Sequence, residues 1–331
     1  MLARHRPLSA CIRTAALAAA IGIFAAAAPP SDPAAAETFS PEILKSVVSV
    51  LPEWPGFTGT PGRDGRPKNP EGTAVAVLPG GYLATNVHVI GRAEKIDIRL
   101  DDGRTVPVEI IGRDTLTDLA LIKAPIDLPV PALAPEPTLG ARVCAVGNQF
   151  GMGLSVTCGV VSALHRTGTG FNEIEDFIQT DAVVNPGGSG GALVDGQGRL
   201  VGLVSAIFTK DSDANIGVNF AASTRLLMRV VADLKDHGRV IRGQAGFGVR
   251  ELTKAERKTS TGAAVDRLAR NGAAIEAGLA VGDIVTAVGN RAVRRASDVA
   301  AAIGLYRPGD RVEITLLRGG TGRKATITLA P

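Results

Sequence analysis

Three residues, His88, Asp118 and Ser189, have the side-chain types needed for nucleophilic catalysis. They lie in the segments T-N-V-H-V, T-D-L-A-L-I-K and G-G-S-G-G. A serine hydroxyl is a weak nucleophile at neutral pH and needs a base within hydrogen-bond reach. His88 can take that proton and later give it to the leaving amine, while Asp118 can fix the imidazole tautomer and stabilise the imidazolium. Singly, the segments are equally typical of a core histidine, a strand and a glycine-rich turn, but in this order they predict a serine triad.

The glycines around Ser189 indicate how negative charge on the substrate would be stabilised. Glycine lets the chain turn tightly there, so the backbone amides of Gly187 and Ser189 would point into one hollow. Two such donors form an oxyanion hole, and the loss of one typically costs roughly 2.7–4 kcal/mol of transition-state stabilisation. Gly188 supplies no side chain to brace this loop, so we expect a less rigid hole.

Short apolar runs divided by Gly, Pro and Asp surround these segments, and such runs are typical of strands in a β-barrel or sandwich. Examples are residues 47–51, 73–78, 96–100 and 119–122. A Pro/Gly-rich insertion at 51–71 is expected to be a mobile surface loop. Proline-rich residues 124–140 predict a connector between two half-domains, and a second strand-rich block covers 142–220.

A helix is predicted after the second block. Ser223 can cap it, five apolar residues recur at helical spacing, and Gly238 can end it. Residues 239–331 then mix strands with a helical pattern at 297–303, which predicts a separate small domain.

The N-terminus has the pattern of a targeting segment. Three arginines precede an uncharged, mostly apolar run of 15 residues, and three alanines at 34–36 offer a cleavage site. This pattern predicts a secretory signal peptide over 1–36 and a periplasmic or secreted protein, with no membrane span after cleavage. The alternative is an uncleaved inner-membrane anchor, although the apolar run is shorter than the roughly 20 residues of a membrane span.

Cys144 and Cys158 remain after removal of such a segment, in an oxidising compartment. They are equidistant from Gly151 in a turn-rich stretch, so a hairpin centred there would place them opposite each other. A disulfide and a pair of small buried residues are both compatible with this spacing.

Composition narrows the classes of partner. The chain of 331 residues has only 12 aromatic residues, which argues against stacking surfaces for single-stranded nucleic acid. Its net charge of +4 is the sum of regions with opposite charge. Residues 37–238 carry 17 basic and 23 acidic side chains, whereas residues 239–331 carry 16 basic and 8 acidic ones. The opposite signs predict salt-sensitive docking of the two regions. We interpret the small basic cluster of Arg291, Arg294 and Arg295 as a solvated face.

The chain resembles the HtrA (Deg) family of trypsin-like serine proteases. The resemblance rests on the three segments above and on G-N-Q-F-G, F-I-Q-T-D-A-V-V-N and N-I-G-V-N-F-A, and it runs from about residue 40 to the C-terminus. It implies a mainly β protein, with a trypsin-like double β-barrel protease domain over 37–238 and a small α+β PDZ domain over 239–331. Gly188 stands where the family has Asn, and Gln149 where it usually has Pro. In this family the oxyanion loop can switch between inactive and active arrangements.

The resemblance also places a primary specificity pocket. Its base would be Val183, six residues before the nucleophile, and one wall would be Ser205, Ala206 and Ile207. Cleavage after Lys or Arg requires a buried carboxylate, which Val183 cannot supply. A bulky wall and an apolar floor therefore predict a preference for small aliphatic residues before the cleaved bond.

Two segments near the C-terminus resemble a PDZ domain of the HtrA type. R-G-Q-A-G-F at 242–247 matches a carboxylate-binding loop, with Gln244, Ala245, Gly246 and Phe247 at the binding positions. A-G-L-A-V-G-D-I-V at 277–285 matches a second marker. Backbone amides of such a loop bind a terminal carboxylate, and the following strand pairs with the peptide. An alternative register places the loop at 246–249.

Together these features predict an exported serine endopeptidase that degrades unfolded or damaged envelope proteins, with a PDZ domain that recruits or senses exposed C-termini. The resemblance implies a homotrimer. We expect no cofactor, no metal and no nucleic-acid partner. Two alternatives are a holdase or peptide-binding protein with a dormant protease, and a regulatory protease with one client anchored in the inner membrane.

Overall fold

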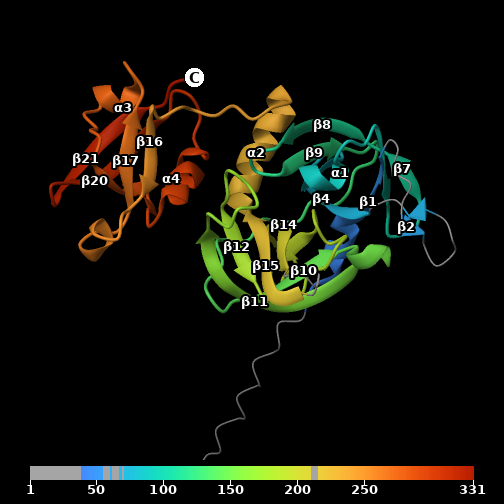
Figure 1. Ribbon diagram of the computed structural model, residues 1–331. Helices are drawn as coiled ribbons and strands as arrows, with labels where there is room; N and C mark the ends of the chain where they lie inside the picture. Colours follow the sequence, from blue (N-terminus) through green and yellow to red (C-terminus); the bar gives the residue numbers. More distant parts are fainter. Residues whose placement is uncertain (1–38, 55–59, 62–66, 69–70, 210–214) are drawn as a thin grey trace, which may run out of the picture. The chain divides into compact units, whose positions relative to one another are not determined.

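A computed structural model of the chain describes residues 39–54, 60–61, 67–68, 71–209 and 215–331 (Figure 1). These residues all belong to the compact unit Glu37–Pro331. The signal peptide predicted over residues 1–36 lies outside the described residues and stays a prediction. In the described ranges, no helix is long and apolar enough to cross a membrane.

The first sheet has seven antiparallel strands in the order β7-β6-β1-β4-β5-β9-β8. They are β1 (Val47–Glu53), β4 (Gly72–Leu78), β5 (Tyr82–Asn86), β6 (Lys95–Arg99), β7 (Thr105–Pro107), β8 (Glu109–Asp114) and β9 (Leu119–Lys123). The apolar runs predicted as strands lie within one or two residues of β1, β4, β6 and β9. A one-turn helix, α1 (Val87–Ile90), follows β5 without a loop, and a 3-10 helix, Pro41–Ser46, precedes β1.

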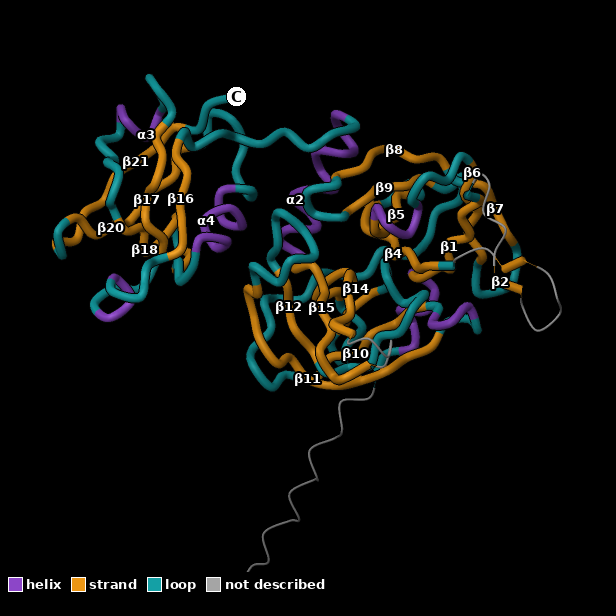
Figure 2. The backbone as a smooth tube through the Cα atoms, viewed as in Figure 1, coloured by secondary structure: helices purple, strands orange, loops and turns teal. Residues whose placement is uncertain are grey.

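The insertion at 51–71 lies mostly outside the described residues. Within it, β2 (Thr60–Pro61) pairs with β3 (Pro67–Lys68). The proline-rich connector predicted at 124–140 is irregular, as the tube in Figure 2 shows between β9 and β10.

The second sheet closes into a barrel with the order β10-β11-β12-β15-β14-β13. Its strands are β10 (Arg142–Gly147), β11 (Ser155–Arg166), β12 (Phe177–Thr180), β13 (Ala192–Val194), β14 (Leu200–Thr209) and β15 (Asn215–Ser223). A 3-10 turn, Gln149–Gly151, lies in the connection from β10 to β11.

The hairpin of β10 and β11 resolves the question of the two cysteines. Its register places Cys144 directly opposite Cys158. The two residues form a disulfide, with their Cα atoms 4.0 Å apart. The hairpin centred on Gly151 is therefore confirmed, and of the two readings of the cysteines the disulfide is correct.

Helix α2 (Thr224–His237) follows β15 and confirms the helix predicted from the sequence. The hydroxyl of Ser223 accepts a hydrogen bond from the amide of Leu226, which is an N-cap, and Gly238 ends the helix in a left-handed conformation. The apolar face of α2, which includes Leu226, Leu227 and Leu234, joins a core shared by both barrels. This helix therefore ties the two halves of the domain together.

The C-terminal domain has its own sheet and core. The sheet order is β16-β17-β18-β20-β21, with β19 paired to β18. Its elements are β16 (Phe247–Glu251), β17 (Ala263–Leu268), α3 (Ala273–Glu276), β18 (Ile284–Val288), β19 (Arg291–Ala292), α4 (Ala296–Ile303), β20 (Arg311–Arg318) and β21 (Thr321–Thr328), with a 3-10 turn at Glu256–Lys258. β16 is an edge strand and has α4 beside it. The helical pattern predicted at 297–303 is confirmed as α4.

Candidate active site

His88, Asp118 and Ser189 line one cavity of about 590 Å³. His88 lies on α1, directly after β5, and Asp118 lies in the tight turn between β8 and β9. Ser189 lies in the loop that leads into β13. Three segments separated by up to 101 positions in the sequence therefore converge where the two barrels meet.

The contact between His88 and Asp118 is the best-defined part of this site. The Nδ1 atom of His88 lies 2.6 Å from Oδ2 of Asp118, and the backbone amide of His88 donates to Oδ1 of the same carboxylate at 2.9 Å. Asp118 has a positive φ of 58°, a backbone conformation that residues other than glycine rarely adopt. Its carbonyl accepts hydrogen bonds from the amide of Val87 and from Nδ2 of Asn86, both at 3.0 Å. These contacts fix the imidazole so that Nε2 is the nitrogen left to act as a base.

Ser189 is held by its backbone. Its carbonyl accepts a hydrogen bond from the amide of Thr73 at 2.9 Å. In the described part of the chain its hydroxyl makes no hydrogen bond to His88. Such bonds are often long in the absence of substrate and tighten in the Michaelis complex.

Two hydrogen bonds set the orientation of the predicted oxyanion loop, residues 186–189. The amide of Phe150 donates to the carbonyl of Pro186 at 2.7 Å, and the hydroxyl of Thr73 donates to the carbonyl of Gly187 at 2.6 Å. Because a trans peptide is planar, its N–H points away from its carbonyl. The amide of Gly187 therefore points away from Phe150. Neither this amide nor that of Ser189 donates to any other described group, so both are available to an oxyanion.

Gly187 has no room for a side chain. Its φ is +93°, and a Cβ atom would lie 2.3 Å from the carbonyl oxygen of Asn148. Gly188 is different, because its φ is not positive and a Cβ atom would lie 3.0 Å from its nearest neighbour, the carbonyl oxygen of Asn185. The conformation of the loop therefore requires glycine at position 187 but not at position 188.

A buried network braces the oxyanion loop from behind. The hydroxyl of Thr73 also accepts a hydrogen bond from the amide of Asn148, at 2.9 Å. The Nδ2 atom of Asn148 donates to the carboxylate of Glu71 at 2.6 Å, and Arg99 donates to the same carboxylate oxygen at 2.8 Å. Glu71 lines the cavity as well. The loop is therefore fixed to the first barrel and to the β10–β11 hairpin.

The predicted specificity pocket is only partly described. Ser205 is buried and lines the cavity. Val183 does not line it: 41% of this residue is exposed, and its carbonyl accepts a hydrogen bond from the hydroxyl of Thr157. Ala206 and Ile207 lie on β14, but their side chains are outside the described part of the structure. The roles assigned to these four residues stay predictions.

The predicted carboxylate loop precedes the edge strand β16. The amide and carbonyl of Gln244 both pair with Ala330, at 2.8 and 2.9 Å. Ala245 is buried, Gly246 has a φ of +73°, and Phe247 begins β16. In the described ranges, the amides of Ala245 and Gly246 donate to no other group, so they are free to bind a carboxylate.

The second PDZ-like segment, residues 277–285, is held in place by hydrogen bonds to Asp283. Asp283 is buried and accepts hydrogen bonds from the amide of Ala280 and from two nitrogens of Arg318. Burial opposes ionisation of Asp283, but these hydrogen bonds outweigh it and lower the pKa of the carboxyl below its usual value.

Sequence reasoning did not identify several supporting residues, among them Thr73, Glu71 and Asn148. Their contacts join positions far apart in the chain, and no spacing rule reports such pairs. Asn86 had a usable signal, because it lies two residues before His88 in the T-N-V-H-V segment.

Comparisons with known proteins agree with this fold. Residues 72–203 match the trypsin-like peptidase domain, and residues 215–329 match the PDZ domain. The fold and the site thus define a trypsin-like peptidase domain joined to a PDZ domain.

Individual relatives indicate which family of trypsin-like peptidases the chain is similar to. The chain is 36% identical over 249 residues to the periplasmic serine endoprotease DegP of Salmonella typhimurium, with 72% of this chain and 52% of the relative covered. It is 36% identical over 258 residues to the periplasmic pH-dependent serine endoprotease DegQ of Escherichia coli K12, with 75% and 56% covered. The chain spans about half the length of these curated relatives.

A solved structure of the HtrA-type protease AlgW with a tripeptide superposes with a TM-score of 0.70 at 35% identity, and covers 87% of this chain and 94% of that chain. The chain belongs to the HtrA family of trypsin-like serine proteases. The predicted fold class, mainly β with a trypsin-like double β-barrel domain followed by a PDZ domain, is confirmed.

Proposed function

We propose that the protein is an exported serine endopeptidase that cleaves unfolded polypeptides through an acyl-enzyme intermediate. One observation carries the proposal. His88, Asp118, Ser189 and Gly187 all line one cavity, with His88 bound to Asp118 and the amide of Gly187 bound to no described group. This set of groups supplies a base, a nucleophile and an oxyanion donor in one place.

Each group has a defined task in the proposed reaction. Nε2 of His88 takes the proton of Ser189 as Oγ attacks the substrate carbonyl. The amides of Gly187 and Ser189 bind the oxyanion that forms. His88 then protonates the leaving amine, and water hydrolyses the acyl-enzyme with His88 again as the base. Asp118 stays ionised and stabilises the imidazolium.

We infer that small aliphatic residues are preferred before the cleaved bond. The charged groups that line the cavity are acidic, Glu71 and Asp118, apart from the imidazole of His88. Glu71 is bound to Arg99 and Asn148, and Asp118 is bound to His88. Among the described residues that line the cavity, no carboxylate is left to receive Lys or Arg, which supports the preference. Faster cleavage of peptides with Arg than with Val at this position would contradict it.

We further propose that the C-terminal domain binds exposed C-termini by adding the peptide as a strand beside β16. The free edge of β16 and the free amides of Ala245 and Gly246 support this. The solved relative with a bound tripeptide shows that an HtrA-type protease binds peptides. Periplasmic location and a homotrimer are part of the same proposal and follow from the resemblance.

The proposal is tested with one substrate protein in two states. A substrate that contains disulfides is offered to the enzyme in its folded form, and again after reduction and alkylation have unfolded it. We expect rapid fragmentation of the unfolded form by the wild type, little of the folded form, and none of either by Ser189→Ala. Equal cleavage of both forms would contradict a role in removing unfolded proteins.

A second candidate is a holdase with a dormant protease. Gly188 favours it, because glycine directly before Ser189 supplies no side chain to brace the oxyanion loop. Suppression of client aggregation by both the wild type and Ser189→Ala, without any fragmentation, would support this candidate instead.

A further inference from the structure

A second cavity, of about 260 Å³, shares no lining residue with the active-site cavity. Its walls come from the end of β11, the first turn of α2, and residues 290–298 around β19 and α4. We infer that this cavity binds a multivalent oxyanion of the phosphate type. The inference goes beyond the proposed protease function and does not depend on it.

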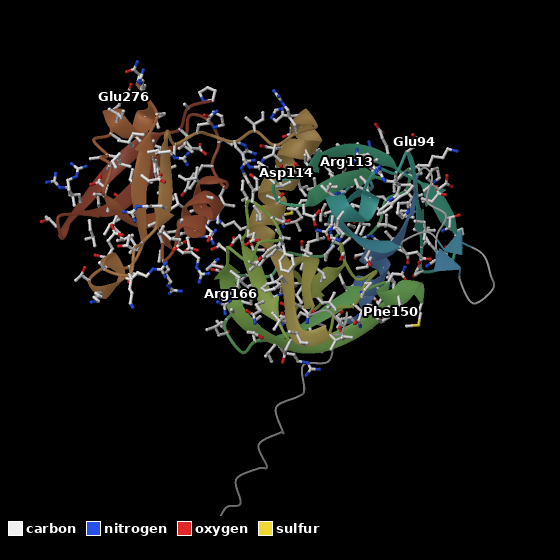
Figure 3. All side chains as sticks on the ribbon, in the orientation of Figure 1. Glu94, Arg113, Asp114, Phe150, Arg166 and Glu276 are labelled. Carbon is white, nitrogen blue, oxygen red and sulfur yellow. A yellow bond between two sulfur atoms is a disulfide. The ribbon has the colours of Figure 1, made fainter. Side chains whose placement is uncertain are left out.

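The cavity has a strong excess of positive charge. Five arginines line it, together with His165 and only two carboxylates. The arginines are Arg166, Arg225, Arg291, Arg294 and Arg295. Figure 3 labels Arg166 where β11 ends on the rim of the second barrel. Such a concentration of like charge in a concave site attracts anions.

Both lining carboxylates are already engaged. Asp298 accepts hydrogen bonds from the hydroxyl of Thr167 at 2.5 Å and from the amides of Arg294 and Arg295 at 2.7 and 3.1 Å. Glu136 lies 2.9 Å from Nε2 of His165. Among the described contacts, neither of these two carboxylates pairs with an arginine side chain of the cavity, so neither neutralises a guanidinium charge there.

Arg291 is the fixed part of the site. Only 11% of its side chain is exposed, and Nη2 donates to Oδ1 of Asp176 at 2.5 Å. Burial opposes ionisation of Asp176, but hydrogen bonding from His165 and the charge of Arg291 hold the pKa of this carboxyl at about 2. The other terminal nitrogen of Arg291, Nη1, is buried and has no hydrogen-bond partner among the described groups. A buried guanidinium nitrogen without a partner is costly unless a ligand supplies one.

Three further arginines, Arg225, Arg294 and Arg295, supply additional donors. In the described part of the chain, Arg225 and Arg294 make no side-chain hydrogen bond or ion pair, and Arg295 reaches only the carbonyl of Thr167, at 3.5 Å. The planar fork of a guanidinium matches two oxygens of a phosphate group. Two guanidinium groups without a described partner, a third held only by a long contact, and the fixed group of Arg291 suit an anion with several charged oxygens better than a single carboxylate.

The test measures binding of tripolyphosphate to the full mature protein by calorimetry, with ionic strength held constant by NaCl. The site variant is Arg294→Gln/Arg295→Gln. The matched control is Arg270→Gln/Arg311→Gln, which removes the same charge from the same domain at exposed positions outside the cavity. We expect saturable binding by the wild type, at least tenfold weaker binding by the site variant, and a change below twofold in the control.

A second arm separates a free anion from a lipid headgroup. Flotation with phosphatidylglycerol vesicles is compared with flotation with phosphatidylcholine vesicles for the same three proteins. Binding of tripolyphosphate that needs Arg294 and Arg295 assigns a soluble anion, and vesicle binding alone with the same requirement assigns a headgroup. Equal effects of the site and control variants, or no saturable binding in either arm, would overturn the inference. Labelling of Ser189 by a fluorophosphonate, measured in parallel, reports the protease site separately.

Discussion

At the scale of single residues, the catalytic geometry depends on one unusual backbone conformation. Asp118 has a positive φ, which lets one carboxylate contact both the amide and the ring of His88. Asn86 and Val87 hold its carbonyl from the other side. The chain thus fixes the two proposed catalytic residues, Asp118 and His88, relative to each other in the absence of substrate.

Replacement of Asp118 by Asn should separate this role from that of folding. Asn tolerates a positive φ, so the turn should persist. The amide favours the wrong imidazole tautomer, and we expect kcat to fall by about 10⁴-fold. Steady-state kinetics and the unfolding temperature of Asp118→Asn, each compared with the wild type, check this. A kcat within tenfold of the wild type would show that Asp118 does not orient His88.

Gly187 offers a prediction for the oxyanion hole. In Gly187→Ala the new methyl group would collide with the carbonyl of Asn148, so the amide must move. We expect kcat to fall by about 10²–10³-fold. Gly140→Ala is the control, because Gly140 has a similar φ of +78° and open space around it. Equal losses of activity in the two variants would attribute the effect to backbone strain alone.

The convergence of His88, Asp118 and Ser189 on one cavity could be predicted, because the chain order and the flanking segments are distinctive. Their catalytic roles, and the oxyanion role of the amides of Gly187 and Ser189, stay predictions. The brace made by Thr73, Asn148 and Glu71 could not be predicted, since it joins residues up to 114 positions apart through tertiary packing.

At the scale of elements, the β10–β11 hairpin contains the disulfide and also contacts the loop before Ser189. The disulfide cross-links the two strands of the hairpin. The turn of the hairpin carries Phe150, whose amide donates a hydrogen bond to the carbonyl of Pro186. The turn-rich stretch between two apolar runs is compatible with a hairpin centred on Gly151, which would place the two cysteines opposite each other. The sequence could not decide between a disulfide and two buried residues, because a shift of one residue in register would separate the sulfurs.

Removal of the disulfide should destabilise the protein. For a sequence separation of 14 residues, we expect Cys144→Ala/Cys158→Ala to lose about 3 kcal/mol of unfolding free energy. The unfolding temperature of the wild type should fall to that of the variant on addition of dithiothreitol, and the variant itself should not respond. A wild type that is insensitive to the reductant and no more stable than the variant would contradict this.

Helix α2 was fully predictable, since its cap, its apolar spacing and its terminal glycine are all local signals. The insertion at 51–71 was not testable, because most of it lies outside the described residues.

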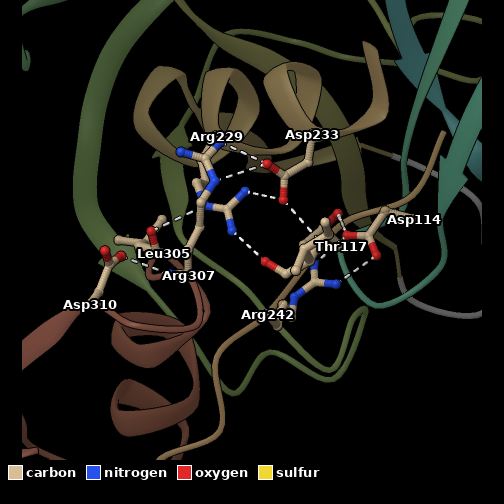
Figure 4. Close-up of polar contacts among 9 residues, drawn as sticks. Asp114, Thr117, Arg229, Asp233, Arg242, Leu305, Arg307 and Asp310 are labelled. Atoms are coloured by element: carbon tan, nitrogen blue, oxygen red, sulfur yellow. Dashed lines mark hydrogen bonds and ion pairs between the residues drawn. The ribbon is translucent and has the colours of Figure 1, made fainter. Parts of the chain in front are cut away.

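At the scale of the whole molecule, acidic and basic regions meet through specific ion pairs. Asp233 on α2 contacts Arg229 and also Arg307 of the C-terminal domain, at 2.5 and 2.6 Å (Figure 4). Arg242, at the start of that domain, binds both carboxylate oxygens of Asp114. The charge difference read from the sequence predicted such docking, but the partners could not be named from composition.

A further ion pair, between Asp176 and Arg291, makes the stability of the fold depend on pH. Because the pKa of Asp176 is about 2 in the folded protein, below its usual 3.8, its ionised form stabilises the fold. This contribution, about 2 kcal/mol, is present above pH 4 and is lost as the pH falls through 2. In Arg291→Gln the pKa of Asp176 should rise toward its usual 3.8, so this contribution should shrink and the loss of stability between pH 4 and pH 2 should be smaller than in the wild type.

Unfolding temperatures measured between pH 2 and pH 6 check this. Arg311→Gln serves as a control that changes the same charge at an exposed site. Parallel curves for the wild type and Arg291→Gln would show that Asp176 does not depend on this arginine.

The most direct test of the account is covalent labelling of the purified protein with a fluorophosphonate, located by mass spectrometry. We predict labelling of Ser189 in the wild type, none in Ser189→Ala, and at least 100-fold slower labelling in His88→Ala. Absence of labelling in the wild type, with or without a C-terminal peptide that fills the PDZ domain, would contradict the claim that Ser189 is an activated nucleophile.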